Sequence, residues 1–72
     1  MKIEATHIEK IIGLFQEAKV WNNGKFSDAV SKYCNENSLN EKQVHLKLKK
    51  AFNAYLATNI SSENSIRHFL SQ

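Results

Sequence analysis

Three residue types are scarce in this 72-residue chain, and each scarcity excludes a class of structure. Proline is absent and glycine occurs only at Gly13 and Gly24, so few positions would interrupt a helix. Cys34 is the only cysteine, which excludes an internal disulfide, and no Cys/His cluster has the spacing of a metal site. A core of this size must therefore be stabilised by apolar packing alone, and a homodimer would add to it.

Long apolar runs are also missing. The longest falls far short of the ~20 residues that a membrane span requires, and the N-terminus lacks the basic-then-apolar order of a signal peptide. We therefore expect a cytoplasmic protein without a membrane segment. Its content of 42% hydrophobic and 24% charged residues is typical of globular proteins, which predicts a single helical domain over residues 1–72.

Arginine is nearly absent, since the chain has nine lysines and one arginine, together with eight asparagines. Lysine and asparagine have A/T-rich codons, so this bias indicates a low-GC genome. Phages and mobile elements often have such genomes, as do many bacterial chromosomes. The bias therefore bears on the source of the chain and not on its mechanism.

The apolar residues recur with the period of a helix and never alternate, which predicts an all-α bundle of about four short helices. The first begins at Thr6, where Thr6 and Glu9 form a capping box, and ends at Asn22-Asn23-Gly24. Gly13 within it indicates either close approach of a neighbouring helix or a tolerated defect. The predicted apolar stripe comprises Ile8, Ile11, Ile12, Phe15 and Ala18, widened by Leu14, Val20 and Trp21.

Three further helices follow. The second runs from about residue 26 to residue 35, and the polar stretch 35–38 forms a turn. The third extends from a cap at Asn40 to Ala57, and a fourth begins after Ser61 or Ser62. Their predicted buried residues are Phe26, Ala29, Val30, Tyr33 and Cys34; Val44, Leu48, Ala51, Phe52, Tyr55 and Leu56; and Ile66, Phe69 and Leu70.

The positive charge is concentrated in one segment. The whole net charge of +3 lies in residues 25–50, where six lysines oppose three acidic residues. At 100° per residue, much of this charge falls on the side of the third helix that lies opposite its buried stripe. That outer side carries Lys42, Leu46, Lys49, Lys50 and Asn53. Leu46 is its only large apolar residue, so either a neighbouring helix covers it or it belongs to a contact surface.

This charge pattern favours a DNA-binding or nucleoprotein-associated regulator in which the second and third helices form a helix-turn-helix. The predicted base-reading residues are Asn40, Gln43 and Lys47, with His45 beside them. The predicted phosphate contacts are Lys25, Lys32, Lys42, Lys49 and Lys50. Two features argue against this interpretation. Arginine, the usual reader of guanine, is scarce, and Glu41 would lie near the proposed DNA-contact surface.

Two alternatives remain open. The first is a protein-binding inhibitor or adaptor that docks the Lys/Leu46 face on an acidic partner, with Leu46 and Trp21 as interface anchors. The second is a homo-oligomeric structural protein whose lysines serve only helix propensity and solubility.

Catalytic constellations are missing from the sequence. Cys34 falls on the apolar side of its helix, which favours a small buried hydrophobe over a reactive thiol. His7, His45 and His68 lack ligand spacing, and Asp28 has no carboxylate near it in sequence. There is no glycine-rich phosphate loop. We therefore expect no enzyme, no catalytic or metal-binding residue and no cofactor.

Overall fold

Four α-helices make up the regular structure. A computed structural model of the chain describes residues 3–21 and 24–72, and no strand occurs within them. The helices are α1 (Ala5–Ala18), α2 (Gly24–Glu36), α3 (Glu41–Ala57) and α4 (Ser62–Leu70). The predicted all-α bundle is therefore confirmed. None of these helices has the length and apolar content needed to cross a membrane.

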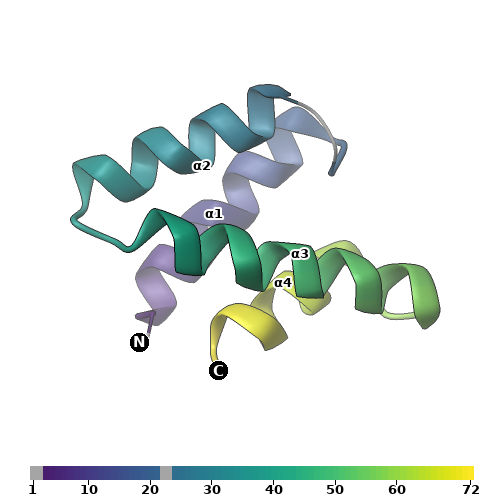
Figure 1. The fold of residues 1–72 in the computed structure, drawn as a ribbon. Coiled ribbons are helices and arrows are strands. Elements are labelled where there is room, and N and C mark those ends of the chain that lie inside the picture. The colour runs from purple at the N-terminus through teal and green to yellow at the C-terminus, as the bar shows by residue number, and fades with distance from the viewer. Residues whose placement is uncertain (1–2, 22–23) are drawn as a thin grey trace.

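The helices pack in a closed order in which each contacts two others. α3 has its most extensive contact with α4, while α1 contacts α2 and α4, and α2 contacts α3. In Figure 1, α2 and α3 both extend from the turn that joins them toward the same side of the picture, with opposite chain directions, and they diverge away from the turn. This arrangement does not confirm the predicted helix-turn-helix.

The start of α1 differs from the predicted capping box at Thr6. The N-cap is Glu4, whose side chain makes no capping hydrogen bond, and its backbone carbonyl accepts from the N–H groups of His7 and Ile8 at 3.0 and 3.1 Å. The reason is a buried residue outside the helix. Ile3 precedes the cap and shares the core with Ile8 at the fourth helical position, which is the spacing of a hydrophobic staple.

The end of α1 comes earlier than the predicted stop at 22–24. The helix ends at Ala18, and Lys19 takes a left-handed conformation with φ 66°, its N–H donating to the carbonyl of Phe15 at 2.7 Å. Gly24, predicted as part of that stop, is instead the first residue of α2, and residues 22 and 23 lie outside the described residues. Val20 is consequently 48% exposed and does not widen the stripe.

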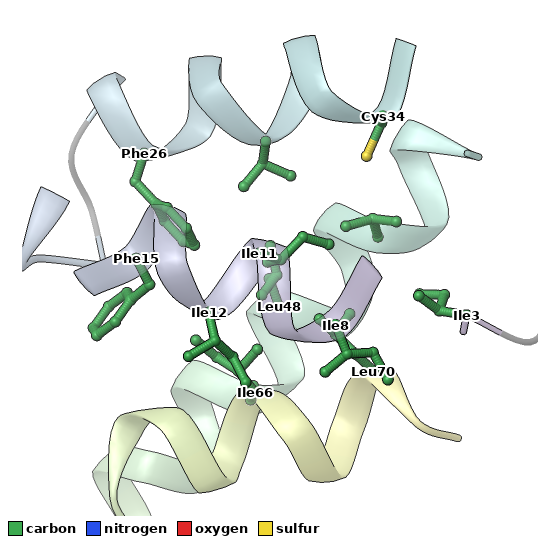
Figure 2. Packing of buried hydrophobic residues seen from close by; sticks show 13 residues of the cluster. Ile3, Ile8, Ile11, Ile12, Phe15, Phe26, Cys34, Leu48, Ile66 and Leu70 are labelled. Carbon is green, nitrogen blue, oxygen red and sulfur yellow. The ribbon is translucent and has the colours of Figure 1, made fainter. Parts of the chain in front are cut away.

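The core lies between the four helices and confirms most of the predicted apolar positions. Figure 2 shows side chains from all four helices meeting there, including Ile11 from α1 and Ile66 from α4. Ile3 and Ser65 are buried as well, and the sequence did not predict either. The buried hydrophobic residues are Ile3, Ile8, Ile11, Ile12, Phe15, Phe26, Val30, Cys34, Val44, Leu48, Ala51, Ile66 and Leu70.

Two residues of the predicted stripe on α3 are exposed, and a third, Phe52, is half-buried. Tyr55 is 37% exposed and Leu56 is 66% exposed. Both lie in the last turn of α3, at the end far from the α2–α3 turn. Because α2 diverges from α3 toward that end, it does not cover this turn (Figure 1). The prediction was wrong there because helical periodicity identifies a face and not the length of the neighbour that covers it.

The predicted caps of the later helices are confirmed. The side-chain oxygen of Asn40 accepts from the backbone N–H of Gln43 at 3.1 Å, and that of Ser61 accepts from the N–H of Asn64 at 3.2 Å. Between α2 and α3, Ser38 has a φ of 56°, and the N–H of Leu39 bonds back to the carbonyl of Cys34 at 2.8 Å. This closing bond is that of a Schellman motif, so the end of α2 and the start of α3 are both specified locally.

Candidate binding site on α3

The outer face of α3 carries the five residues predicted for it, and all five are exposed. They are Lys42, Leu46, Lys49, Lys50 and Asn53. Leu46 is 49% exposed, so the alternative in which a neighbouring helix covers it is wrong, and its place in a contact surface stays a prediction. The chain has no aspartate or glutamate from Lys42 to Ser62. The outer face is therefore a basic surface with one apolar residue and no carboxylate of its own.

The lysines of this face are not neutralised within the molecule. In residues 3–21 and 24–72 the salt bridges are Arg67–Glu9 and a 4.0 Å contact between Glu41 and His45, which is ionic only when the histidine is protonated. Neither involves Lys42, Lys49 or Lys50. Their ammonium groups are therefore free to meet an external anion, with solvent and salt as the competitors.

The predicted base-reading residues do not share this face. Asn40 uses its side-chain oxygen to cap α3, and the His45 ring forms a 2.9 Å hydrogen bond with the hydroxyl of Ser31 on α2. The ammonium of Lys47 donates to the backbone carbonyl of Gln72, beyond the end of α4. Only Gln43 remains exposed without a side-chain bond in the described structure. The predicted group is thus dispersed over the cap and both flanks of α3.

The lysines of α2 lie on a different surface. Ser27 and Ser31 mark the side of α2 that faces α3, because the first lines the space between the helices and the second bonds His45. At 100° per residue, Lys25 and Lys32 lie about 100° or more around the helix from both serines. Both lysines are exposed. The lysines of residues 25–50 are therefore divided between the outer side of α2, the outer face of α3 and, for Lys47, the flank of α3 that meets the end of the chain.

A groove of about 580 Å³ opens between α2 and α3, on the side away from their turn. Its apolar surface comes mainly from large side chains, and its polar surface includes Lys49 and His45 but no carboxylate. We call it the α2–α3 groove. Its lining residues are Trp21, Gly24, Phe26, Ser27, Val30, His45, Leu48, Lys49, Phe52 and Asn53. Lys49 and Asn53 belong both to the groove and to the outer face, so the two surfaces are continuous.

The sequence contained a signal for this groove that periodicity in apolar residues did not reveal. Gly24, Ser27 and Ser31 recur at intervals of three and four residues, so they form one side of α2. Because none of them has a large side chain, that side leaves space in front of α3. The prediction that Gly24 ends the first helix assigns it to the wrong element, because Gly24 is the first residue of α2 and shares a side with the two serines.

Trp21, predicted as an interface anchor, is half-buried at one end of the groove. Its ring lies 4.8 Å from that of Phe15, 5.4 Å from that of Phe52 and 5.8 Å from that of Tyr55, measured between centroids. Its indole N–H is buried, and among the described residues it has no hydrogen-bond acceptor. Within the described residues, Trp21 is thus held by packing against the core and these aromatic rings and not by a side-chain hydrogen bond.

The reactive side chains are dispersed. Cys34 is fully buried, as predicted, and burial raises the pKa of its thiol. The histidines bind separate neighbours, with His7 on Tyr33, His45 on Ser31 and His68 on Gln72. Within the part of the chain that is described, no three His, Cys, Asp or Glu residues are grouped so as to hold a metal ion. Comparison with known protein families, curated proteins and solved structures finds no match.

Proposed function

We propose that this protein is a non-enzymatic, cytoplasmic nucleic-acid-binding regulator, of the kind that phages or mobile elements encode, and that it contacts phosphates through the outer face of α3. The observation that carries this proposal is the state of Lys42, Lys49 and Lys50, which are exposed and form no salt bridge within the described residues. Lysine ammonium groups on one helix face favour phosphate oxygens, and binding releases the counterions of the nucleic acid.

The binding we propose is independent of base sequence. Asn40, His45 and Lys47 have partners inside the molecule, so they are poorly placed to read base edges. Lys42 and Lys49 are seven residues apart, a separation of about 10.5 Å along the helix axis, which lets both contact one backbone. Contacts of this kind position a protein on nucleic acid without specifying a site.

A matched pair of charge reversals tests this proposal. Lys49→Glu with Lys50→Glu alters the outer face of α3, whereas Lys10→Glu with Lys19→Glu makes the same change in net charge on and just after α1. We expect polarisation of a labelled random-sequence duplex to show affinity that falls with salt, with a log–log slope of about 0.9 per phosphate contact. The α3 pair should abolish this binding and the α1 pair should largely retain it. Equal losses in both, or no binding by the unaltered chain, would refute the proposal.

A second candidate function is docking of the same face on an acidic protein. It is favoured by Leu46, which is 49% exposed among lysines and so resembles an apolar anchor with a charged rim. Leu46→Gln distinguishes the candidates because it removes the apolar contact without altering charge. Duplex binding should then be unchanged, whereas a protein partner captured on the unaltered chain should be lost from the variant.

A further inference from the structure

The α2–α3 groove is a feature that the proposed role of the lysine face does not explain. We propose that it receives the apolar side of an acidic amphipathic helix belonging to a partner protein. Helix-in-groove recognition places apolar side chains spaced i, i+3, i+4 and i+7 into a hydrophobic groove. The argument rests on the shape of the groove, on its charge and on the apolar surface that continues from it.

The shape fits an inserted helix. A volume of about 580 Å³ lies within the range of roughly 300–1,000 Å³ that is usual for pockets holding small organic ligands, so the groove has room for apolar side chains of a partner. The half-buried Trp21 and Phe52 line the groove together with the buried Phe26 and Leu48, while Gly24 and Ser27 on the α2 side present no bulky side chain. A third helix could therefore bring its apolar side chains down between α2 and α3.

The charge of the groove selects the kind of helix. Lys49 and His45 line it, and no aspartate or glutamate does. Two acidic residues lie near the groove without lining it. Glu41 is 4.0 Å from His45, and Asp28, which follows Ser27 on α2, is exposed. A second copy of this chain is a poor occupant because its net charge is also +3. Charge complementarity therefore favours an acidic partner whose carboxylates meet Lys49.

Apolar surface continues beyond the groove along α3. Tyr55 and Leu56 follow Phe52 by three and four residues, so they extend the same side of the helix, and they are 37% and 66% exposed. The ring of Trp21 contacts both Phe52 and Tyr55, which connects the groove to this surface. A helix several turns long would cover the groove and the exposed turn together.

Selection from a displayed peptide library tests the inference. Each peptide would have about 16 residues, enough to support a helix. Leucine or phenylalanine would occupy positions i, i+3, i+4 and i+7, and glutamate or lysine would occupy the others. We expect the peptides selected on the unaltered chain to be rich in glutamate. Their binding should change the fluorescence of Trp21, which is the only tryptophan.

Two blocking variants locate the binding. Ser27→Phe fills the groove from α2 and Asn53→Phe fills it from α3, and both positions are exposed, so each variant provides a check should the other fail to fold. The control is Asn35→Phe, at an exposed position of α2 that does not line the groove. Each blocking variant should weaken a selected peptide by about tenfold or more, as loss of a central contact does, and the control should not. Lysine-rich selections, no selected binder, or undiminished binding to the folded blocking variants would overturn the inference.

Discussion

α3 packs against α4 on one side and α2 on the other, and serines bridge the two contacts differently. On the α4 side, the hydroxyl of Ser65 donates directly to the backbone carbonyl of Ala51 at 2.5 Å, and both residues are fully buried. On the α2 side, the hydroxyl of Ser31 reaches only the ring of His45, at 2.9 Å, and both residues are half-buried. A short serine side chain that bonds backbone requires the two helices to lie close together, whereas a bond to a long side chain can span a wider separation.

The comparison shows that small residues do not by themselves bring helices together. Ser65 of α4 contacts another small residue, Ala51 of α3, and both are fully buried, so solvent does not reach this contact. We call the α3–α4 contact the sealed contact. Gly24 and Ser27 line the groove together with the larger Leu48 and Phe52. The two helices that carry them diverge from a short turn (Figure 1). The sealed contact is expected to supply stability, and the open contact to supply binding surface.

The largest expected effect is the loss of stability when a fully buried side chain of α4, at the sealed contact, is shortened. Ile66→Ala should lower the free energy of unfolding by about 2–5 kcal/mol, because it leaves a cavity where the side chain is now fully buried. Leu56→Ala, at the open end of α3, should change it by no more than about 0.5 kcal/mol. Chemical denaturation followed by circular dichroism measures both. Similar losses at the two positions would remove the distinction between the regions.

A smaller effect should distinguish the two serine bridges. Ser65→Ala removes a buried hydrogen bond and should cost about 1 kcal/mol of unfolding free energy. Ser31→Ala should cost less, because solvent can replace the bond at a half-exposed site. The same denaturation measurement ranks them, and a larger loss for Ser31→Ala would show that the α2–α3 contact is the tighter one.

A substitution that stabilises α1 tests whether the groove region of α2 unfolds together with the rest of the molecule. No atom outside the local helix backbone lies within 4 Å of a β-carbon placed on Gly13, so the structure favours a tolerated defect over close helix approach. Gly13→Ala should therefore raise the free energy of unfolding by about 0.5–1 kcal/mol. Native-state hydrogen exchange should slow in α1 and α4 but not in the part of α2 beside the groove. Uniform slowing would indicate that the groove does not open independently.

Local patterns account for what the sequence predicted correctly. The cap at Asn40, the cap at Ser61 and the outer face of α3 depend on residues a few positions apart, and all three are observed. The start of α1 depends on the burial of Ile3, which is a tertiary effect. The hydrogen bond from Lys47 to Gln72, which is 25 residues away, is likewise a tertiary effect that no local pattern indicates.

The candidate site was therefore only partly predictable. The lysines follow from charge and helical period, but the groove depends on how far α2 and α3 diverge, which no local pattern specifies. The spacing of Gly24, Ser27 and Ser31 indicates a side of α2 with small residues, yet a similar pattern on another helix could equally support close packing. Only the large side chains of α3 opposite them decide between these outcomes.

The smallest expected effect is a pH dependence of stability that comes from the contact between α1 and α4. There Arg67 of α4 binds Glu9 of α1 through two hydrogen bonds of 2.8 and 3.0 Å. The hydrogen bond to Arg67 lowers the pKa of Glu9, and the same pair raises the pKa of Arg67. Because the carboxyl pKa is lower in the folded state, its contribution is complete above the ordinary value of about 4.3 and disappears as the pH falls through the folded value. Glu9→Gln should therefore flatten the acid side of a plot of thermal midpoint against pH, whereas Glu17→Gln on the same helix should not. Both side chains of the pair are about half exposed, so the difference should shrink with added salt. If the difference between the two variants persists at high salt, the ion pair holds α1 and α4 together in addition to their apolar contacts.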